Sequence, residues 1–220
     1  PVFANVVLAD EINRASPKTQ SALLEVMQEQ TVTTDATVYR VPRPFVVVAT
    51  QNPIDLEGTY ALPEAQLDRF LMRLQIGYPA PEAEAQVLRS EKDDASVTHV
   101  TPVLTGDDLL GMIDTVKRAV EVAPVIEQYI VSICAHSRTL PEVRLGVSPR
   151  GGLAMLRAAR VHAAADGRPF VTPDDVRAVA QPTLAHRVIL RPDAEIQGHT
   201  SGDAIARAMQ AVQAPRTLSA

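Results

Sequence analysis

The sequence contains a single cysteine, Cys134, and no tryptophan among its 220 residues. One cysteine excludes an internal disulfide, and because Cys134 lies in an apolar helical pattern, we predict a buried structural thiol rather than a reactive one. Aromatic residues make up only 4% of the chain, so the core must be built from Val, Leu, Ile, Ala and Met. With 46% hydrophobic and 21% charged residues, the composition is that of an ordinary globular protein.

Long hydrophobic runs and an excess of positive charge are also missing. No apolar run reaches the roughly 18 residues of a membrane span, and no signal peptide opens the chain, so we expect a cytoplasmic protein, although a fragment can lose its targeting segment. The net charge of −5 provides no overall positive field for phosphate, which argues against nucleic-acid binding but does not exclude a local basic pore. The five histidines lack ligand spacing, and we assign no structural zinc.

A short apolar run, Val6-Val7-Leu8, ends abruptly in the carboxylates of Asp10 and Glu11. A run of this length without alternation predicts a strand that is buried on both faces of a parallel sheet. The two acids would then lie at the carboxyl end of the strand, where open α/β sheets bind ligands. If the strand ends in a turn, Asp10 can hold a metal-bound water while Glu11 faces a nucleophile, as in a Walker B element. The alternative is a strand that runs into a solvated acidic turn.

A second buried strand is predicted over residues 45–49, and Thr50-Gln51-Asn52-Pro53 follows it. Asn52 therefore lies at a strand end, as Asp10 does. If the two strands are parallel neighbours, Asn52 and the carboxylates face one crevice. An Asn amide can donate to phosphate and accept from water together. The alternative is a turn-forming Asn before a proline.

Three stretches together resemble the MoxR family of AAA+ ATPases in order and spacing: Asp10-Glu-Ile-Asn-Arg-Ala-Ser16, Ala49-Thr-Gln-Asn-Pro53 and Leu62-Pro-Glu-Ala-Gln-Leu-Asp-Arg-Phe70. The resemblance covers residues 1 to about 216, nearly the whole chain. It implies an α/β fold, a partial P-loop NTPase (AAA+) αβα core with parallel strands, followed by an all-α lid. It also implies ATP and Mg²⁺ as ligands, with Asp10 on the metal through water, Glu11 beside the attacking water and Asn52 as sensor 1.

Two arginines receive roles from the same resemblance. Arg69 matches the arginine finger, which reaches the γ-phosphate bound by the neighbouring subunit and pairs its planar fork with phosphate oxygens. Arg150, in Ser148-Pro149-Arg150, matches sensor 2 and would reach the nucleotide from the lid. A finger requires a ring, so the resemblance implies homo-oligomers, with a hexamer as the expected size. Without the family, a surface residue beside a core Phe70 is the commoner case for Arg69. For Arg150, an arginine on a solvated helix end is an equal alternative. Arg73 is a weaker finger candidate.

The chain divides near Tyr78, where Gly77-Tyr78-Pro79-Ala80-Pro81 can continue neither a strand nor a helix. Residues 1–78 would form the carboxyl-terminal part of the nucleotide-binding core, and residues 79–220 the helical lid with its tail. In the core we predict a helix over 17–29, a hairpin over 31–41, a loop over 54–60, a short helix from Pro63 and a last strand ending near 76. The hairpin matches an insertion of this clade, often directed to the ring pore, or is a plain surface hairpin.

The lid is predicted to be helical throughout. Helices should begin at Pro81, Thr105 and Pro124, run from Ser148 to about 165 and from Thr172 to about Leu190, and end with a short helix over 204–212. Gly151 and Gly152 are unfavourable inside a helix, by about 1 kcal/mol each, and are expected to loosen its first turn.

No Gly-x-x-x-x-Gly-Lys-Ser/Thr phosphate loop occurs in the sequence. We therefore expect the chain to be the carboxyl-terminal two-thirds of a longer protein, and to be inactive by itself. Three functions compete: an ATPase that remodels a protein client, often with a von Willebrand factor A-domain partner; a nucleic-acid motor of the same superfamily; and a non-catalytic interaction module.

Overall fold

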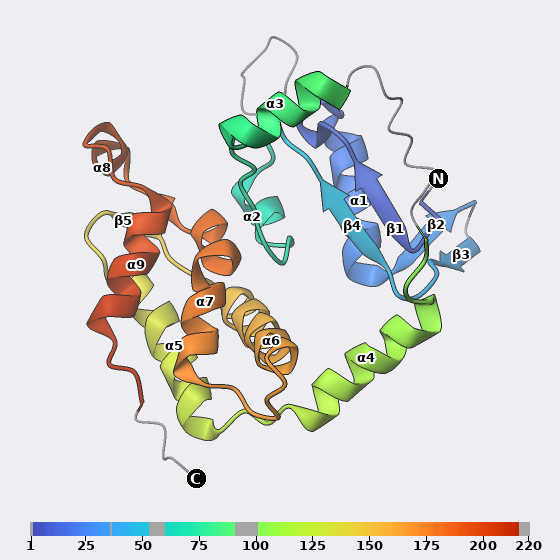
Figure 1. Ribbon diagram of the computed structural model, residues 1–220. Coiled ribbons are helices and arrows are strands. Elements are labelled where there is room, and N and C mark those ends of the chain that lie inside the picture. The colour runs from blue at the N-terminus through green and yellow to red at the C-terminus, as the bar shows by residue number, and fades with distance from the viewer. Residues whose placement is uncertain (1, 36, 53–59, 91–100, 216–220) are drawn as a thin grey trace.

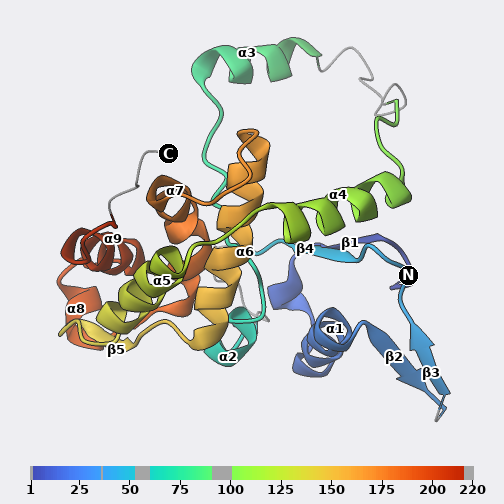
Figure 2. The same ribbon diagram turned by 90° about the horizontal axis from the view of Figure 1, so that it is seen from below.

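A two-stranded parallel sheet and a bundle of helices are the two parts of the computed structural model, which describes residues 2–35, 37–52, 60–90 and 101–215 (Figure 1). The short helix α2 (Glu64–Leu67) lies between the sheet and the bundle, and α4 (Gly106–Ala119) runs from the sheet side to the bundle (Figures 1 and 2). Within these ranges, no helix is long and apolar enough to cross a bilayer.

Strands β1 (Val6–Ala9) and β4 (Val46–Ala49) pair in parallel, with Val6 opposite Val46 and Ala9 opposite Ala49. This confirms the prediction of two parallel neighbours. Because the register has no offset, the residues that follow both strands emerge at the same edge of the sheet.

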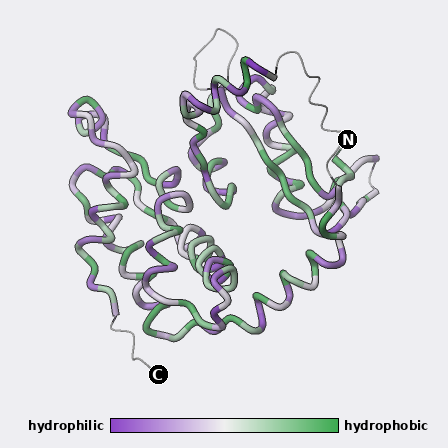
Figure 3. Tube along the Cα trace, in the orientation of Figure 1, coloured by the Kyte–Doolittle hydropathy of each residue, from purple (hydrophilic) through white to green (hydrophobic). Residues whose placement is uncertain are grey.

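The prediction that these strands are buried on both faces is wrong. Ala9 and Ala49 pack on a cluster around Ile12, Leu24 and Leu62, and helix α1 (Pro17–Glu29) contributes Leu24 to it. Hydrophobic residues make up both strands (Figure 3), but the described residues cover only the α1 side. The residues of the other face are between 46% and 65% exposed: Val6, Leu8, Val46 and Val48.

Local signals account for α1 and for the hairpin that follows it. Ser16 caps α1 by accepting a hydrogen bond from the Thr19 N–H at 3.3 Å, and Pro17 fills the first position, as predicted. Strands β2 (Thr31–Thr34) and β3 (Thr37–Arg40) then pair antiparallel, which confirms the hairpin. The loop predicted over residues 54–60 lies almost wholly outside the described residues.

The predicted last strand is wrong. Residues 71–80 are described and form no strand, and the side chains of Leu74 and Ile76 are 75% and 98% exposed. The backbone N–H of Arg73 instead donates to the carbonyl of Pro182 in the bundle, at 2.9 Å. The Arg73 N–H therefore binds the lid, and it is not available for the hydrogen bond to a neighbouring strand that the predicted strand would have needed.

Two helices with exposed faces lead to the bundle. Helix α3 (Pro81–Ser90) begins at Pro81 as predicted. Helix α4 begins at a capping box in which Asp108 accepts from the Thr105 N–H at 2.8 Å and donates its own N–H to Thr105 Oγ1 at 3.2 Å. An aspartate can therefore replace the usual Glu or Gln. Hydrogen bonds from Thr105 hold the pKa of Asp108 below its ordinary value.

The lid core is formed by α5 (Pro124–Ser137), α6 (Pro149–Ala165), α7 (Pro173–Leu184) and α9 (Ser201–Ala211), with α8 (Pro192–Ile196) at its edge. Fully buried Ile133, Met155, Leu184 and Ile205 bring these helices together. Cys134 is 4% exposed, which confirms the buried thiol, and burial raises its pKa. Ser148 and Thr172 cap α6 and α7 as predicted.

The helix predicted from Thr172 to Leu190 ends earlier, at Leu184. A short 3-10 turn follows (Ala185–Arg187), and β6 (Ile189–Leu190) then pairs antiparallel with β5 (Val143–Leu145). The lid is helical, but it contains this small sheet that helical periodicity did not predict. Val188 and Leu190 are buried in this arrangement, and tertiary packing thus outweighs the local helical pattern.

Asp175, at 1% exposure, is the most deeply buried acid among the described residues of the lid, and it is the centre of a polar network. Its carboxylate accepts from Arg168 through both oxygens, from Thr172 Oγ1 at 2.7 Å, and faces His162 Nδ1 at 2.7 Å. Burial alone would raise the pKa of Asp175, but these hydrogen bonds outweigh it and hold the pKa well below its ordinary value. His162, Asp166 and Asp175 lie close together, but Arg168 already forms ion pairs with both carboxylates.

We expect Asp175→Asn to destabilise the lid by about 2 kcal/mol at pH 7, because the amide leaves the charge of Arg168 unpaired. Since the folded-state pKa is depressed, this stabilisation is present above the unfolded pKa of about 4 and declines as the pH falls below it. Urea denaturation of wild type and variant should therefore give a smaller difference at pH 3 than at pH 7. Asp174→Asn, at a neighbouring acid with an 89% exposed side chain, is the control and should change stability by less than about 0.5 kcal/mol. A difference that did not narrow in acid would contradict the assignment.

Candidate functional site

The two acids predicted at the end of the first strand lie in a turn. Strand β1 ends at Ala9, and Glu11 has left-handed backbone angles (φ 46°, ψ 53°), which are uncommon for a non-glycine residue. The strand therefore ends in a turn at the two acids, as the Walker B prediction assumed. A short 3-10 helix, η1 (Ile12–Arg14), follows at once. Such backbone angles are often found at functional sites.

Thr50 joins this turn to the end of β4. Its hydroxyl donates to Asp10 Oδ1 at 2.5 Å and accepts from the Glu11 N–H at 2.8 Å. Its carbonyl accepts from the Ile12 N–H at 3.0 Å. Sequence analysis missed this role of Thr50, although a hydroxyl directly after the second strand, level with the first acid, is a signal that could have indicated it.

Asn52 lies at the same edge, two residues beyond Thr50, and is half-buried. Its carbonyl accepts from Asn13 Nδ2 at 3.3 Å, so the segments after both strands are joined a second time. Asn13 is 9% exposed, and its Oδ1 has no hydrogen-bond partner in the described part of the chain. The structure thus brings the predicted residues Asp10, Glu11 and Asn52 to one edge of the sheet.

The side chain of Gln20 stabilises the turn through hydrogen bonds. This α1 side chain is 1% exposed, and its Nε2 donates to the carbonyls of Ile12 and Tyr60, both at 3.1 Å. Tyr60 in turn donates its N–H to the Asn13 carbonyl at 2.6 Å. One buried amide therefore holds together the helix, the acidic turn and the segment that enters α2.

The side chain of Glu11 forms an ion pair with Arg14, with Oε2 and Nε 2.8 Å apart. The two side chains are 37% and 50% exposed, and an ion pair in contact with water contributes little stability. Glu11 can therefore exchange Arg14 for another partner at small cost.

Arg69 and Arg150, the predicted finger and sensor 2, are both exposed and lie on opposite sides of the core–lid contact. Neither guanidinium has a hydrogen bond or ion pair with another residue in the part of the chain that the structure describes. Arg150 projects from the first turn of α6, a place where a cation faces the positive end of the helix dipole. Phe70, next to Arg69, packs on the same cluster as Ala9 and Ala49 at the strand ends.

Gly151 does not loosen the first turn of α6, contrary to the expectation. A Cβ atom at this position would lie 2.5 Å from Val147 Cγ1 and 3.1 Å from Arg187 Cδ. A Cβ at Gly152 would lie 3.5 Å from Cys134 Sγ, an ordinary contact. Gly151 is therefore required by close packing.

The donor set at the sheet edge fits a hard cation with a phosphate. Asp10 is exposed and supplies carboxylate oxygens, which Mg²⁺ prefers, and the Thr50 hydroxyl keeps that carboxylate in place. Mg²⁺ retains several waters and needs only one or two protein carboxylates. Asp10 would hold the metal, and Arg150, which lies on the lid at the start of α6, is a guanidinium of the kind that binds phosphate.

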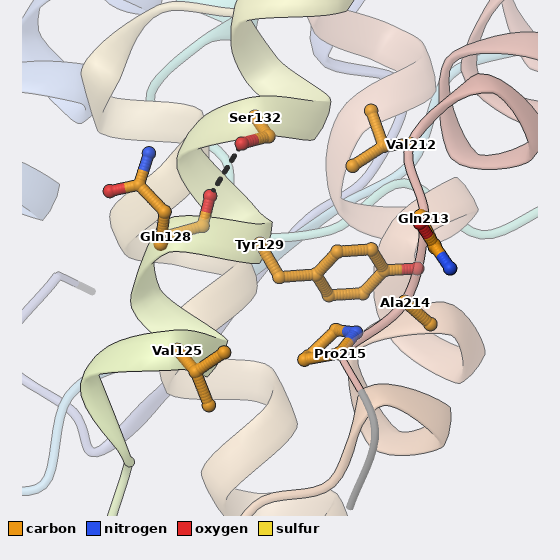
Figure 4. Close-up of a pocket in the computed structure, with 8 residues that line it drawn as sticks. All are labelled: Val125, Gln128, Tyr129, Ser132, Val212, Gln213, Ala214 and Pro215. Atoms are coloured by element: carbon orange, nitrogen blue, oxygen red, sulfur yellow. Dashed lines mark hydrogen bonds between the residues drawn. The ribbon is translucent and has the colours of Figure 1, made fainter.

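A cavity of about 330 Å³ lies elsewhere, in the lid between α5 and the segment after α9 (Figure 4). Val125, Tyr129, Val212 and Pro215 are among its lining residues. None of the predicted site residues lines it, so it is separate from the sheet edge.

Comparisons with known proteins assign the chain to a family. Residues 1–72 match the ATPase family associated with various cellular activities (AAA), and residues 135–212 match the AAA lid domain. The protein MoxR of Methylorubrum extorquens is 34% identical over 96% of this chain and 67% of its own length. The chain belongs to the MoxR family of AAA ATPases.

Other relatives agree with this MoxR-family assignment. Chaperone MoxR1 of Mycobacterium tuberculosis is 40% identical over 98% of this chain and 59% of its own length. The uncharacterized protein YeaC of Bacillus subtilis is 44% identical over the whole chain and 68% of its own length. A crystal structure of a protein from Cytophaga hutchinsonii has a TM-score of 0.92 at 35% identity, over 98% of this chain and 68% of that one. The chain thus spans between 59% and 68% of the length of these relatives, and the α/β AAA fragment with a helical lid is confirmed.

We expect Gln20→Ala to destabilise the core by about 1–3 kcal/mol, because the Ile12 and Tyr60 carbonyls lose their donor. Guanidinium denaturation measures the loss. Gln28→Ala, at an exposed glutamine of the same helix, is the matched control and should change stability by less than about 0.5 kcal/mol. Equal stability of the two variants would show that the buried amide does not hold the turn.

Proposed function

We propose that this chain supplies the Walker B, sensor and finger residues of an ATP-hydrolysing site that works in a ring of identical subunits. AAA ATPases in general bind ATP with Mg²⁺ and are typically oligomeric. The observation that supports the proposal is the parallel pairing of β1 and β4, with a carboxylate turn and Asn52 at one sheet edge. A site for phosphate and metal at the carboxyl ends of parallel strands is the rule for open α/β sheets.

Each residue at this edge has a distinct task in the proposal. Asp10 holds Mg²⁺ through water, and the metal neutralises phosphate charge when it is bound. Glu11 leaves Arg14, orients the attacking water and accepts its proton. Asn52 donates its amide to the γ-phosphate or to that water. Arg150 contacts the nucleotide from the lid.

Arg69 acts on the site of the neighbouring subunit. Its exposure and its lack of a partner among the described residues are what a residue needs to bind across a subunit boundary. A fork of N–H donors matches phosphate oxygens, and such fingers contribute on the order of 10³–10⁵ in rate. The proposal therefore includes a closed ring, with a hexamer as the expected size.

The work of the ATPase is proposed to be the remodelling of a protein client in the cytoplasm, such as complex assembly or cofactor insertion. A relative that bears the name chaperone supports this direction. A von Willebrand factor A-domain protein is the expected partner, and no nucleic acid is expected because the net charge is −5.

The 220-residue chain alone should release no phosphate from ATP and bind nucleotide weakly or not at all, because its sequence has no Gly-x-x-x-x-Gly-Lys-Ser/Thr loop. A nucleotide titration and a phosphate-release assay on these residues test this directly. The full-length protein, meaning the longer polypeptide expected from the sequence, serves as the positive control. Robust turnover by the chain alone would refute the prediction.

In the full-length protein, Glu11→Gln should lower kcat by about 10²-fold or more, because the amide cannot accept the proton, while ATP binding is retained. Steady-state ATPase kinetics and a binding titration measure the two effects. Glu25→Gln, at an exposed acid of α1, is the control and should leave both unchanged. If Glu11→Gln left turnover intact, the catalytic proposal would fail and a non-catalytic interaction module would be favoured.

A further inference from the structure

The carboxylate of Asp68, the residue directly before Arg69, is held from the lid by two donors. Arg187 Nη1 donates to Asp68 Oδ1 at 2.5 Å, and Ser148 Oγ donates to Asp68 Oδ2 at 3.1 Å. Ser148 is also the N-cap of α6, two residues before Arg150. One carboxylate therefore connects the segment of Arg69 to the helix start that carries Arg150.

Arg187 makes more bonds to this segment than the single ion pair. Its Nη1 also donates to the Asp68 carbonyl at 2.6 Å, and its Nη2 donates to the Phe70 carbonyl at 2.6 Å. Its Nε donates back to the Thr183 carbonyl at 2.8 Å, so the guanidinium is anchored in its own domain. With donors on both sides of Arg69 and a side chain that is 2% exposed, Arg187 fixes the backbone that presents the finger.

The side chain of Arg187 is closely packed against the lid. A Cβ atom at Gly151 would lie only 3.1 Å from Arg187 Cδ, so the first turn of α6 presses against the arginine. His186 adds a further contact, with Nε2 3.1 Å from the Phe70 carbonyl. The lid thus holds the Arg69 segment through the buried side chain of Arg187 and the half-buried side chain of His186.

A second core–lid contact provides a comparison. Arg144 and Glu64 form an ion pair at 2.9 Å, but their side chains are 58% and 57% exposed. This pair joins the same two parts of the chain, and among the described residues its two side chains form no hydrogen bond with Asp68 or Phe70. Loss of this ion pair therefore shows the general effect of weaker core–lid attachment, with which a specific effect on Arg69 can be compared.

We propose that Arg187 is a positioning residue for Arg69: through Asp68 and Phe70 it sets the direction of the finger and makes that direction depend on the place of the lid. This inference rests on the proposed function, in which Arg69 serves the neighbouring subunit. A guanidinium has the planar fork needed to hold Asp68 and Phe70 together, and a lysine does not. A change at Arg187 should therefore damage the site of the next subunit rather than its own.

The first test is Arg187→Lys in the full-length ATPase. We expect kcat to fall by about 10- to 100-fold through misplacement of the finger, with KM for ATP changed by less than about twofold. Arg144→Met is the matched control and should retain wild-type kinetics. Full turnover by Arg187→Lys would overturn the inference.

Mixed rings show on which site Arg187 acts. Subunits with Glu11→Gln have an inactive site but an intact finger, which can serve the site of a neighbouring Arg187→Lys subunit. In mixed rings, the turnover per Arg187→Lys subunit should therefore be higher than in rings made of Arg187→Lys subunits alone. Arg69→Ala in the same mixture is the positive control. Loss of turnover without recovery in mixed rings would mean that Arg187 serves its own subunit's site or its fold, and would overturn the inference.

A second variant covers the case in which Arg187→Lys does not fold. Asp68→Asn keeps the shape of the side chain but removes the charge that Arg187 binds, and it should show a smaller loss of kcat that is also recovered in mixed rings.

If Arg69→Ala itself left turnover unchanged, the proposed function would fail and this inference with it. A different outcome would overturn this inference alone: Arg69→Ala lowers turnover, but Asp68→Asn and Arg187→Lys have the same turnover as the control Arg144→Met.

Discussion

The parallel ladder between β1 and β4 is the interaction on which the site depends. Backbone hydrogen bonds continue the ladder past the strand ends, from the Thr50 N–H to the Ala9 carbonyl and from the Ile12 N–H to the Thr50 carbonyl, both at 3.0 Å. Because these bonds fix both chains, the acidic turn and the Thr50-Gln51-Asn52 segment cannot shift independently. A slip of one residue would turn every side chain of the strand to the other face and would separate Thr50 from Asp10.

The same ladder explains the exposed aliphatic face. Parallel strands are normally covered on both sides, and the sequence of β1 and β4 is apolar on both sides accordingly. The described residues supply α1 on one side only, which leaves Val6, Leu8, Val46 and Val48 exposed. The apolar run correctly predicted the strand and its direction. The burial of the strand depends on which elements cover the two faces of the sheet, and the run itself carries no information on those elements.

Features with a local cause could be predicted from the sequence. Ser16 and Thr172 cap helices through donors three residues away, and the strand ends follow from where the apolar runs stop. Contacts between distant residues could not be predicted, because no local pattern records them. Gln20 binds carbonyls 8 and 40 residues away, and Arg187 binds Asp68 across 119 residues. The early end of α7 has the same origin, since it allows Arg187 to reach Asp68 and β6 to pair with β5.

A buried charged contact at the core–lid junction calls for a reason other than stability. Desolvation offsets much of the Coulomb energy of a buried ion pair, and apolar residues of similar volume often stabilise a protein as well or better. What an apolar contact cannot provide is direction: the fork of Arg187 binds Asp68 and the Phe70 carbonyl at the same time, through directional hydrogen bonds. Gly151, which sequence patterns alone would count as a weak point of α6, is the residue that permits this arrangement. Because Arg187 binds Asp68 and Phe70, the residues on either side of Arg69, this contact is suited to fixing the orientation of Arg69.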